Sequence, residues 1–235
     1  MKHLSNDQQG SILPLFGVVI VLVFMVAAVA VDFGRYVLAS EKLQTATDSA
    51  SSAAASTAKR YVKLEINRGK YRTTCPKPGG GSRPCCKSCN ETITVEGRED
   101  KLLDRKGYKK YFCSCGGGKV KLLDRWVKYE GNGSDAIAAA KMFFNLNKPK
   151  EMTNGEGGES AITSVKAINN KSDPRYPSVI VKTEASIKTI MMNFIDKMYP
   201  DTDLSNLGTT KCSQGGSYYY DLDGKWHRAA KDGCD

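Results

Sequence analysis

The sequence predicts an α+β protein in which a long N-terminal transmembrane helix extends into a disulfide-rich, mainly antiparallel β domain with one further helix. Three observations lead to this fold class. Residues 12–31 form an uncharged apolar run, all eight cysteines follow this run, and residues 178–189 alternate between inward and outward positions. The apolar run indicates a membrane helix, whereas a period of two is typical of a half-buried strand.

The run from Ile12 to Val31 contains no charged residue and includes Pro14 and Gly17. At about 1.5 Å of rise per residue, a helix of this length spans the roughly 30 Å hydrocarbon layer of a bilayer. Ala28–Ala30 has the small-x-small form of a signal-peptidase site. The run is longer than the roughly 7–15 apolar residues of a usual signal peptide, so we expect an uncleaved, single-pass anchor.

Small and semi-apolar side chains continue the helical pattern beyond the membrane. They recur at steps of three and four residues, which places them on one helix face. Because most of them are small, this face can lie close to a neighbouring sheet or helix, in this chain or in another subunit. We expect an extramembrane helix over residues 32–66. Its packing residues are Tyr36, Leu43, Ala46, Ala50 and Ala53.

The first part of the chain resembles a known family. The matching elements are Gly10-Ser11, Pro14, the sequence Val-Asp-Phe-Gly-Arg at residues 31–35, and the run Leu-Gln-x-Ala-x-Asp-x-Ala at residues 43–50. Over about fifty residues this segment is similar to the N-terminus of the TadE/TadG-like proteins of tight-adherence (Flp) pilus systems. A weaker similarity to the same family covers residues 135–195.

The resemblance implies a short inner tail, one span and an extracytoplasmic domain, in a non-enzymatic component that helps to assemble or anchor a Flp (Tad)-type pilus or a related surface structure. Its implied partners are the membrane and other pilus or secretion-system subunits. Two alternatives stay open: a pilin-like subunit that forms a homo-oligomer or surface filament, and a secreted or anchored disulfide-rich binding protein. The cysteine-rich middle of the chain has no counterpart in the resemblance.

Cysteine usage indicates the compartment. The eight cysteines are Cys75, Cys85, Cys86, Cys89, Cys113, Cys115, Cys212 and Cys234. An even number in a membrane-tethered domain is typical of disulfides in an oxidising compartment. Because the basic residues on the two sides of the span are nearly balanced, the cysteines decide the orientation, with the tail of residues 1–11 in the cytoplasm and the domain outside. Zinc binding is an alternative role for these cysteines, but the C-x-C spacing is too short for a zinc knuckle.

A cysteine-rich β insert is expected over residues 67–130. Within it, residues 70–90 contain three prolines and three consecutive glycines, which predict an irregular loop tied by disulfides. Strands and turns are expected from there to residue 129. The sequence Lys-Leu-Leu-Asp-Arg occurs at residues 101–105 and again at residues 121–125. This near-repeat is either a duplicated hairpin strand or a coincidence.

A helix and a β-hairpin are expected over residues 131–200. Ser134 can cap a helix from Asp135 to about Asn147. The clearest strand is residues 178–189, and the turn before it makes residues 161–168 its antiparallel neighbour. We expect this strand to continue into the apolar residues 191–195, which would pack on the alanine-rich helix.

A hairpin tail is expected over residues 201–235. Tyr218–Tyr220 and Lys225–Arg228 can pair around Asp223-Gly224, a two-residue turn in which opposed residue numbers sum to 447. The residue numbers of Cys212 and Cys234 sum to 446, one less. A bulge at Gly215-Gly216 would therefore bring the two cysteines opposite each other. We therefore predict a Cys212–Cys234 disulfide, with the other six cysteines paired among themselves.

Composition gives little support to other function classes. The chain has 35 basic and 25 acidic residues, and the whole of this excess follows the span. No basic helix with interleaved aromatic residues is present, so we expect a solvated basic surface and no nucleic-acid partner. The two histidines, His3 and His227, lie in no recognisable catalytic motif. We therefore expect no catalytic residue, metal site, cofactor or small-molecule substrate.

Overall fold

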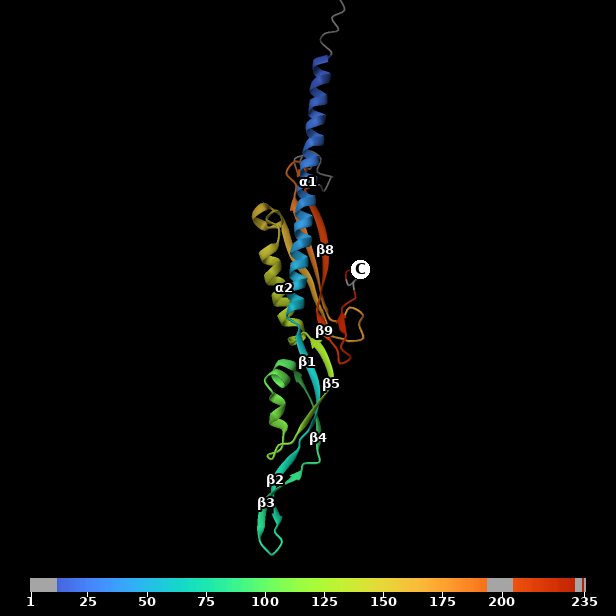
Figure 1. Ribbon diagram of the computed structural model, residues 1–235. Helices are drawn as coiled ribbons and strands as arrows, with labels where there is room; N and C mark the ends of the chain where they lie inside the picture. The colour runs from blue at the N-terminus through green and yellow to red at the C-terminus, as the bar shows by residue number, and fades with distance from the viewer. Residues whose placement is uncertain (1–11, 194–204, 231–233, 235) are drawn as a thin grey trace, which may run out of the picture. The chain divides into compact units, whose positions relative to one another are not determined.

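The structure is a computed structural model that describes residues 12–193, 205–230 and 234 (Figure 1). The predicted tail, residues 1–11, and residues 194–204 lie outside the described residues. The α-helices whose bounds lie within these residues are α1 (Ile12–Ser56) and α2 (Ser134–Asn147). The strands are β1 (Lys59–Asn67), β2 (Lys70–Pro76), β3 (Ser82–Ser88), β4 (Thr92–Arg98), β5 (Lys119–Lys128), β6 (Glu159–Ile168), β7 (Ser178–Lys188), β8 (Asn206–Gly216), β9 (Tyr218–Tyr220) and β10 (Trp226–Arg228).

The predicted fold class is confirmed by the long apolar helix, the antiparallel sheets, the further helix and the disulfide-bonded cysteines. Contacts divide the chain into two compact units, which are described separately below. Unit 1 comprises residues Met1–Ser49, Phe143–Ser164 and Lys182–Cys212. Unit 2 comprises residues Ala50–Met142, Val165–Val181 and Ser213–Asp235.

Helix α1 ends earlier than the sequence indicated. It stops at Ser56, and the chain enters β1 at Lys59, so residues 59–66 of the expected extramembrane helix form a strand. The hydroxyl groups of Ser56 and Thr57 donate hydrogen bonds to carbonyls one turn back, at 2.7 Å each. The physical reason for the change is the sequence after this point, where buried and partly exposed side chains alternate with a period of two, as in a strand.

The core of unit 2 lies on one face of a three-stranded sheet. Strand β1 is central and pairs antiparallel with both β4 and β5. Val62, Leu64 and Ile66 point from β1 into the core and are fully buried. Leu102, from the short helical segment between β4 and β5, covers them. Burying three such side chains contributes about 1.5–3 kcal/mol each, which makes β1 the element that organises this unit.

Strands β2 and β3 form a two-stranded hairpin, so the prediction of an irregular loop over residues 70–90 was wrong. Pro84 lies in β3, which pairs on one side only, and a proline that faces the free side of a ribbon removes no ladder hydrogen bond. The turn is formed by Gly79, Gly80 and Gly81, whose φ angles of 98°, 93° and 92° exclude other residue types.

Six of the cysteines pair among themselves, as predicted. The bonds are Cys75–Cys85, Cys86–Cys115 and Cys89–Cys113, with Cα–Cα distances of 5.8, 6.1 and 6.9 Å. The two cysteines of the C-x-C sequence thus reach different partners. These disulfides take up the cysteines that a zinc site would need. Closing loops of this size removes about 3–4 kcal/mol of conformational freedom from the unfolded chain for each bond.

The two copies of Lys-Leu-Leu-Asp-Arg have different structures. Residues 100–104 form a short π-helical segment, whereas residues 121–125 lie within β5. The near-repeat is therefore not a duplicated hairpin strand. The first copy covers the sheet and the second copy is part of the sheet. The contacts around each copy outweigh the intrinsic secondary-structure preference of the five residues.

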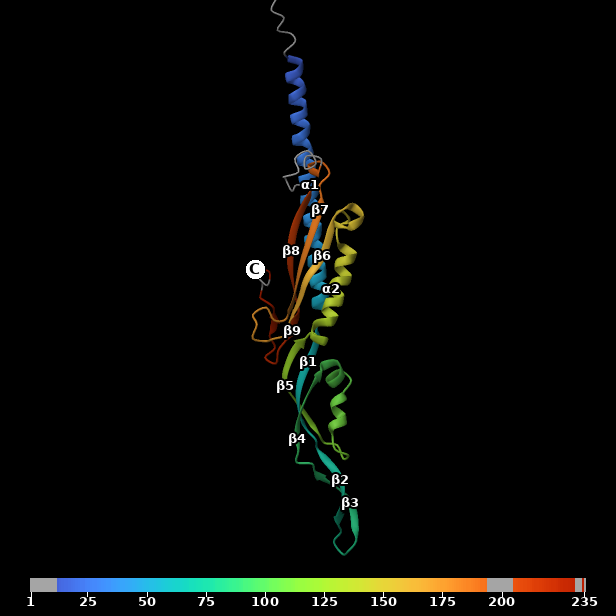
Figure 2. The same cartoon turned by 180° about the vertical axis from the view of Figure 1, so that it is seen from behind.

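The predicted helix and hairpin in the second half of the chain are present. Helix α2 begins at Ser134 and ends at Asn147, within one residue of the expected bounds. Strand β7 lies between β6 and β8 in a second three-stranded sheet, so the expected neighbour of β7 is correct (Figure 2). The expected inward side chains of β7 are all buried: Val179, Val181, Thr183, Ala185 and Ile187. Strand β8 was not expected from the sequence.

The C-terminal hairpin has a register one residue away from the prediction. Tyr218, Tyr219 and Tyr220 pair with Arg228, His227 and Trp226, so opposed residue numbers sum to 446. The loop is one residue longer than the expected two-residue turn, because Asp221 pairs with Lys225 through its backbone and accepts a hydrogen bond from the amide of Lys225 on its side chain. Gly224, at φ 78°, supplies the left-handed residue that a three-residue loop requires.

The Cys212–Cys234 bond stays a prediction. It no longer requires a bulge, because the two residue numbers sum to 446, as do those of the hairpin pairs. Both cysteines are disulfide-bonded. Peptide mapping of the unreduced protein should recover one cross-linked peptide that contains Cys212 and Cys234. A cross-link from either cysteine to residues 75–115 would contradict the hairpin argument.

Candidate membrane-proximal site

The first part of α1 is an exposed apolar surface. The helix begins at Ile12, and Pro14, Gly17 and Val31 are all exposed. The most apolar window of 18 residues has a mean hydropathy of 2.9, and none of it is buried. This segment is long and apolar enough to cross a membrane. Phe24, whose side chain is 70% exposed, illustrates the contrast with a core helix, which would bury such a residue.

Directly after the apolar run, a buried carboxylate joins α1 to the segment that follows β7. Asp32 is only 3% exposed. Its Oδ1 accepts a hydrogen bond from the amide of Ile190 at 3.1 Å. Its Oδ2 accepts hydrogen bonds from the amides of Met191 and Met192 at 2.7 and 2.9 Å. A loop whose three successive amides converge on one carboxylate is fixed to the helix at this height.

The ionised form of Asp32 is favoured by these contacts. Burial alone would raise its pKa, but the three backbone amides, with the nearby guanidinium of Arg35, lower the pKa below its ordinary value. The nearest Arg35 nitrogen lies 3.9 Å from Oδ1. The carboxylate therefore stays charged while its oxygens are occupied by protein donors.

Several residues next to Asp32 in the chain, or bonded to it through their amides, have exposed apolar side chains. Phe33 and Ile190 are each 59% exposed, and Met191 is 47% exposed, whereas Met192 packs inward at 9%. The expected continuation of the strand into residues 191–195 is wrong for the described part, because β7 ends at Lys188. The amides of Ile190, Met191 and Met192 donate to Asp32 and not to a neighbouring strand. Residues 194 and 195 lie outside the described residues.

The tyrosine after the span has a mixed role. Tyr36 is half-buried, and its ring centroid lies 6.2 Å from that of Phe33. Its hydroxyl donates a hydrogen bond to the carbonyl of Gly208 at 3.3 Å, which ties α1 to β8 within unit 1. A tyrosine with an apolar ring and a bonded hydroxyl is typical of a membrane–water boundary.

Further along α1, small residues form the buried face. Leu43, Ala46 and Ala50 are completely buried, whereas Ala53 is half-buried. In unit 1 this face also contains Thr47, which shares a buried hydrogen bond of 2.9 Å with Thr183 of β7. In unit 2 it contains Ser51, which is hydrogen-bonded to Ser213 of β8 at 2.9 Å. The face is thus covered by this chain's own strands.

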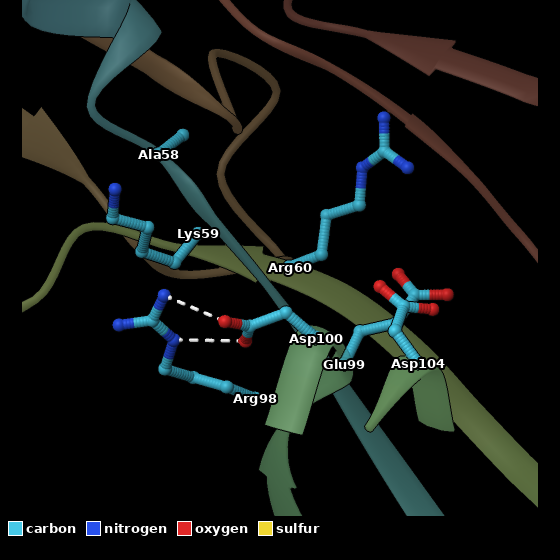
Figure 3. Close-up of a pocket in the computed structure, with 7 residues that line it drawn as sticks. All are labelled: Ala58, Lys59, Arg60, Arg98, Glu99, Asp100 and Asp104. Atoms are coloured by element: carbon cyan, nitrogen blue, oxygen red, sulfur yellow. Dashed lines mark hydrogen bonds and ion pairs between the residues drawn. The ribbon is translucent and has the colours of Figure 1, made fainter. Parts of the chain in front are cut away.

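A separate pocket of about 320 Å³ lies at the start of β1 (Figure 3). It is lined by Ala58, Lys59, Arg60, Arg98, Glu99, Asp100 and Asp104. Arg98 forms two hydrogen bonds of 3.0 Å with the carboxylate of Asp100, and Arg60 extends away from this pair (Figure 3). Glu99 is paired with Arg125 at 2.8 Å. Much of the charge in this lining is therefore neutralised within the chain.

The ion pairs of this pocket continue beyond its rim. Arg98 also approaches Glu130 at 3.6 Å, and Tyr61 donates a 2.6 Å hydrogen bond to the other oxygen of Glu130. This hydrogen bond, together with burial, raises the pKa of Tyr61 to about 12. The arrangement holds β1, β4 and the end of β5 together, which is a structural role.

His227 lies beside the carboxylate of Asp221. Its Nε2 lies 2.5 Å from Oδ2 of Asp221 in the loop of the C-terminal hairpin, and its ring stacks on Tyr219. Neither residue lines the pocket at the start of β1. The pair fixes the hairpin loop, where the backbone of Asp221 also bonds Lys225.

Sequence reasoning missed the role of Asp32. The residue was visible as the first charge after the apolar run and as part of the Val-Asp-Phe-Gly-Arg sequence. Its partners are backbone amides some 160 positions later in the chain. Backbone donors carry no sequence signature, so only the three-dimensional structure shows that this charge is buried.

Comparison with known proteins gives one similarity. No curated protein and no solved structure matches this chain. Residues 10–57, which contain the exposed apolar segment, Asp32 and the buried small-residue face, match the model of a family described as putative Flp pilus-assembly TadE/G-like.

Proposed function

We propose that this chain is a membrane-anchored structural or assembly component of a Flp (Tad)-type pilus or a related surface structure. The family match supports a role related to Flp pilus assembly, in a family that is structural and not enzymatic. The observation that carries the proposal is the coincidence of this match with α1. The matched residues include both the exposed apolar segment and the buried small-residue face of α1.

The proposed topology places the tail of residues 1–11 in the cytoplasm and the remainder, after one span at residues 12–31, outside. The disulfides support an extracytoplasmic position, because such bonds persist in oxidising compartments. The proposed partners are the membrane, through the exposed segment, and other subunits of the pilus or secretion system, through the outer domain.

Protease protection tests the topology. With one epitope tag at each terminus, protease added to intact spheroplasts should remove the C-terminal tag and leave the N-terminal tag with a fragment of the span. Lysed spheroplasts are the control, in which both tags should be digested. A protected C-terminal tag on intact spheroplasts would overturn the orientation and with it the extracytoplasmic role.

A filament subunit is the second candidate, because α1 is one continuous helix whose exposed apolar part would fill the core of a filament equally well. Mechanical shearing separates the two. A membrane-anchored component stays with the membrane fraction after surface filaments are sheared off, whereas a filament subunit is recovered with the sheared filaments as their main protein.

A further inference from the structure

We propose that Phe33, Ile190 and Met191 form a second membrane contact, an apolar collar that rests in the headgroup region of the bilayer beside the span. These three residues are called the collar below. The inference rests on the proposed anchoring of residues 12–31 and adds a part of the outer domain to the surface that touches lipid.

The depth of the collar is set by Asp32. This residue directly follows Val31, the last residue of the uncharged run. The amides of Ile190 and Met191 lie 3.1 and 2.7 Å from its carboxylate oxygens. The loop backbone is thus held within one hydrogen bond of the point where the span ends. The polar region on each side of the hydrocarbon layer is about 5–8 Å thick, so a loop at this height lies inside it.

The exposed surface of the loop has the chemistry of an interface with lipid. Ile190 and Met191 are turned outward, and Phe33 is exposed to the same extent as Ile190. Such side chains gain about 25 cal/mol for each Å² of apolar surface that leaves water. Exposed apolar side chains of α1 also extend to the end of the span, since Val31 is itself 58% exposed.

The nearby charges are placed as a membrane interface requires. The carboxylate of Asp32 is 3% exposed and occupied by backbone donors, so this residue presents no anionic group to the lipid. Basic side chains lie just outside the collar. Arg35 is one helical turn further along α1, and Lys188 is exposed at the end of β7. Long basic side chains near the end of a span can extend their charged ends to the headgroup phosphates.

The collar has a structural consequence for anchoring. A span alone leaves the outer domain free to tilt about the end of the helix. With Ile190 and Met191 fixed to Asp32 and seated in the headgroups, unit 1 contacts the bilayer through two segments that are far apart in the sequence. The same apolar surface could instead receive a second copy of the chain, and the experiment below separates these occupants.

Brominated lipids test the collar directly, because bromine quenches tryptophan fluorescence only at short range. The full-length protein is reconstituted into phosphatidylcholine vesicles with bromine near the headgroup end of the acyl chains. Met191→Trp is compared with Phe24→Trp in the span and with Leu146→Trp, an exposed position on α2. The wild type, with its two native tryptophans, provides the background. We expect the added emission of Met191→Trp and Phe24→Trp to be lost, and that of Leu146→Trp to remain.

Three other outcomes overturn the proposal in distinguishable ways. If Phe24→Trp is quenched and Met191→Trp is not, the anchor stands and the collar does not touch lipid. If Met191→Trp is unquenched but its emission shifts to the blue as the protein density in the vesicles rises, the surface binds a second copy. If neither variant is quenched, the proposed membrane anchoring itself is wrong.

Discussion

Gly215→Ala should destabilise unit 2 by about 3 kcal/mol or more, because β8 passes α1 at a distance that leaves no room for a methyl group. A Cβ atom at Gly215 would lie 2.0 Å from the carbonyl oxygen of Ser51 and 2.4 Å from its carbonyl carbon. Both are backbone atoms of α1, so no side chain can move aside. Overpacking of a core costs about 1–3 kcal/mol even where side chains are able to adjust.

The matched control is the next glycine. At Gly216 the nearest atom to an added Cβ is the Cβ of Ala229 at 3.7 Å, an ordinary contact. Urea unfolding followed by circular dichroism, in the same detergent, should therefore give Gly216→Ala the stability of the wild type within about 0.5 kcal/mol. Equal midpoints for the two variants would show that β8 does not lie against α1 in this way.

Asp32→Ala should lower the free energy of unfolding by about 3 kcal/mol or more, since it leaves the amides of Ile190, Met191 and Met192 without their acceptor. An unsatisfied buried donor costs about 1–3 kcal/mol, and hydrogen bonds to a charged group are the stronger ones. Glu41→Ala removes a carboxylate from an exposed position of the same helix and serves as the control. Thermal unfolding of the two purified variants in detergent measures the difference. Equal losses would contradict a specific role for Asp32.

The contribution of Asp32 should also depend on pH. Because its folded-state pKa is lowered, the stabilisation is complete above the ordinary carboxyl pKa of about 4 and is lost as the pH falls through the lower folded value. The stability difference between the wild type and Asp32→Asn should therefore shrink as the pH falls below about 4. A difference that stays constant down to pH 2 would show that hydrogen bonding alone, without charge, is responsible.

Much of the fold could be predicted from the sequence because its signals are local. The uncharged run gives the exposed apolar helix, Ser134 gives the start of α2, and alternation over residues 178–189 gives β7 with its buried face. Each of these depends on residues that are neighbours in the chain. Periodicity and capping report such neighbours directly.

The remainder depends on contacts that are distant in the sequence. Prolines and glycines in residues 70–90 indicated a loop, yet pairing in an isolated ribbon and a disulfide accommodate them as β2 and β3. The sequence Lys-Leu-Leu-Asp-Arg is helical in one place and extended in another. The packing face of α1 was predicted as a pattern of small residues, but its partners, Thr183 and Ser213, lie on strands that begin more than 100 residues later.

The cysteine pairing has a mechanical consequence. Cys85 and Cys86 are adjacent, so the bonds Cys75–Cys85 and Cys86–Cys115 join into a covalent path that runs from residue 75 to residue 115 through two disulfides and one peptide link. The two disulfides close residues 76–84 and 87–114 into loops that lie outside this covalent path. When the chain is pulled from its ends, tension bypasses them, and roughly 120 Å of extended chain, at about 3.3 Å per residue, is not released. Under tension the chain would thus lengthen in the segments outside residues 75–115, and a reducing agent would restore the missing extension.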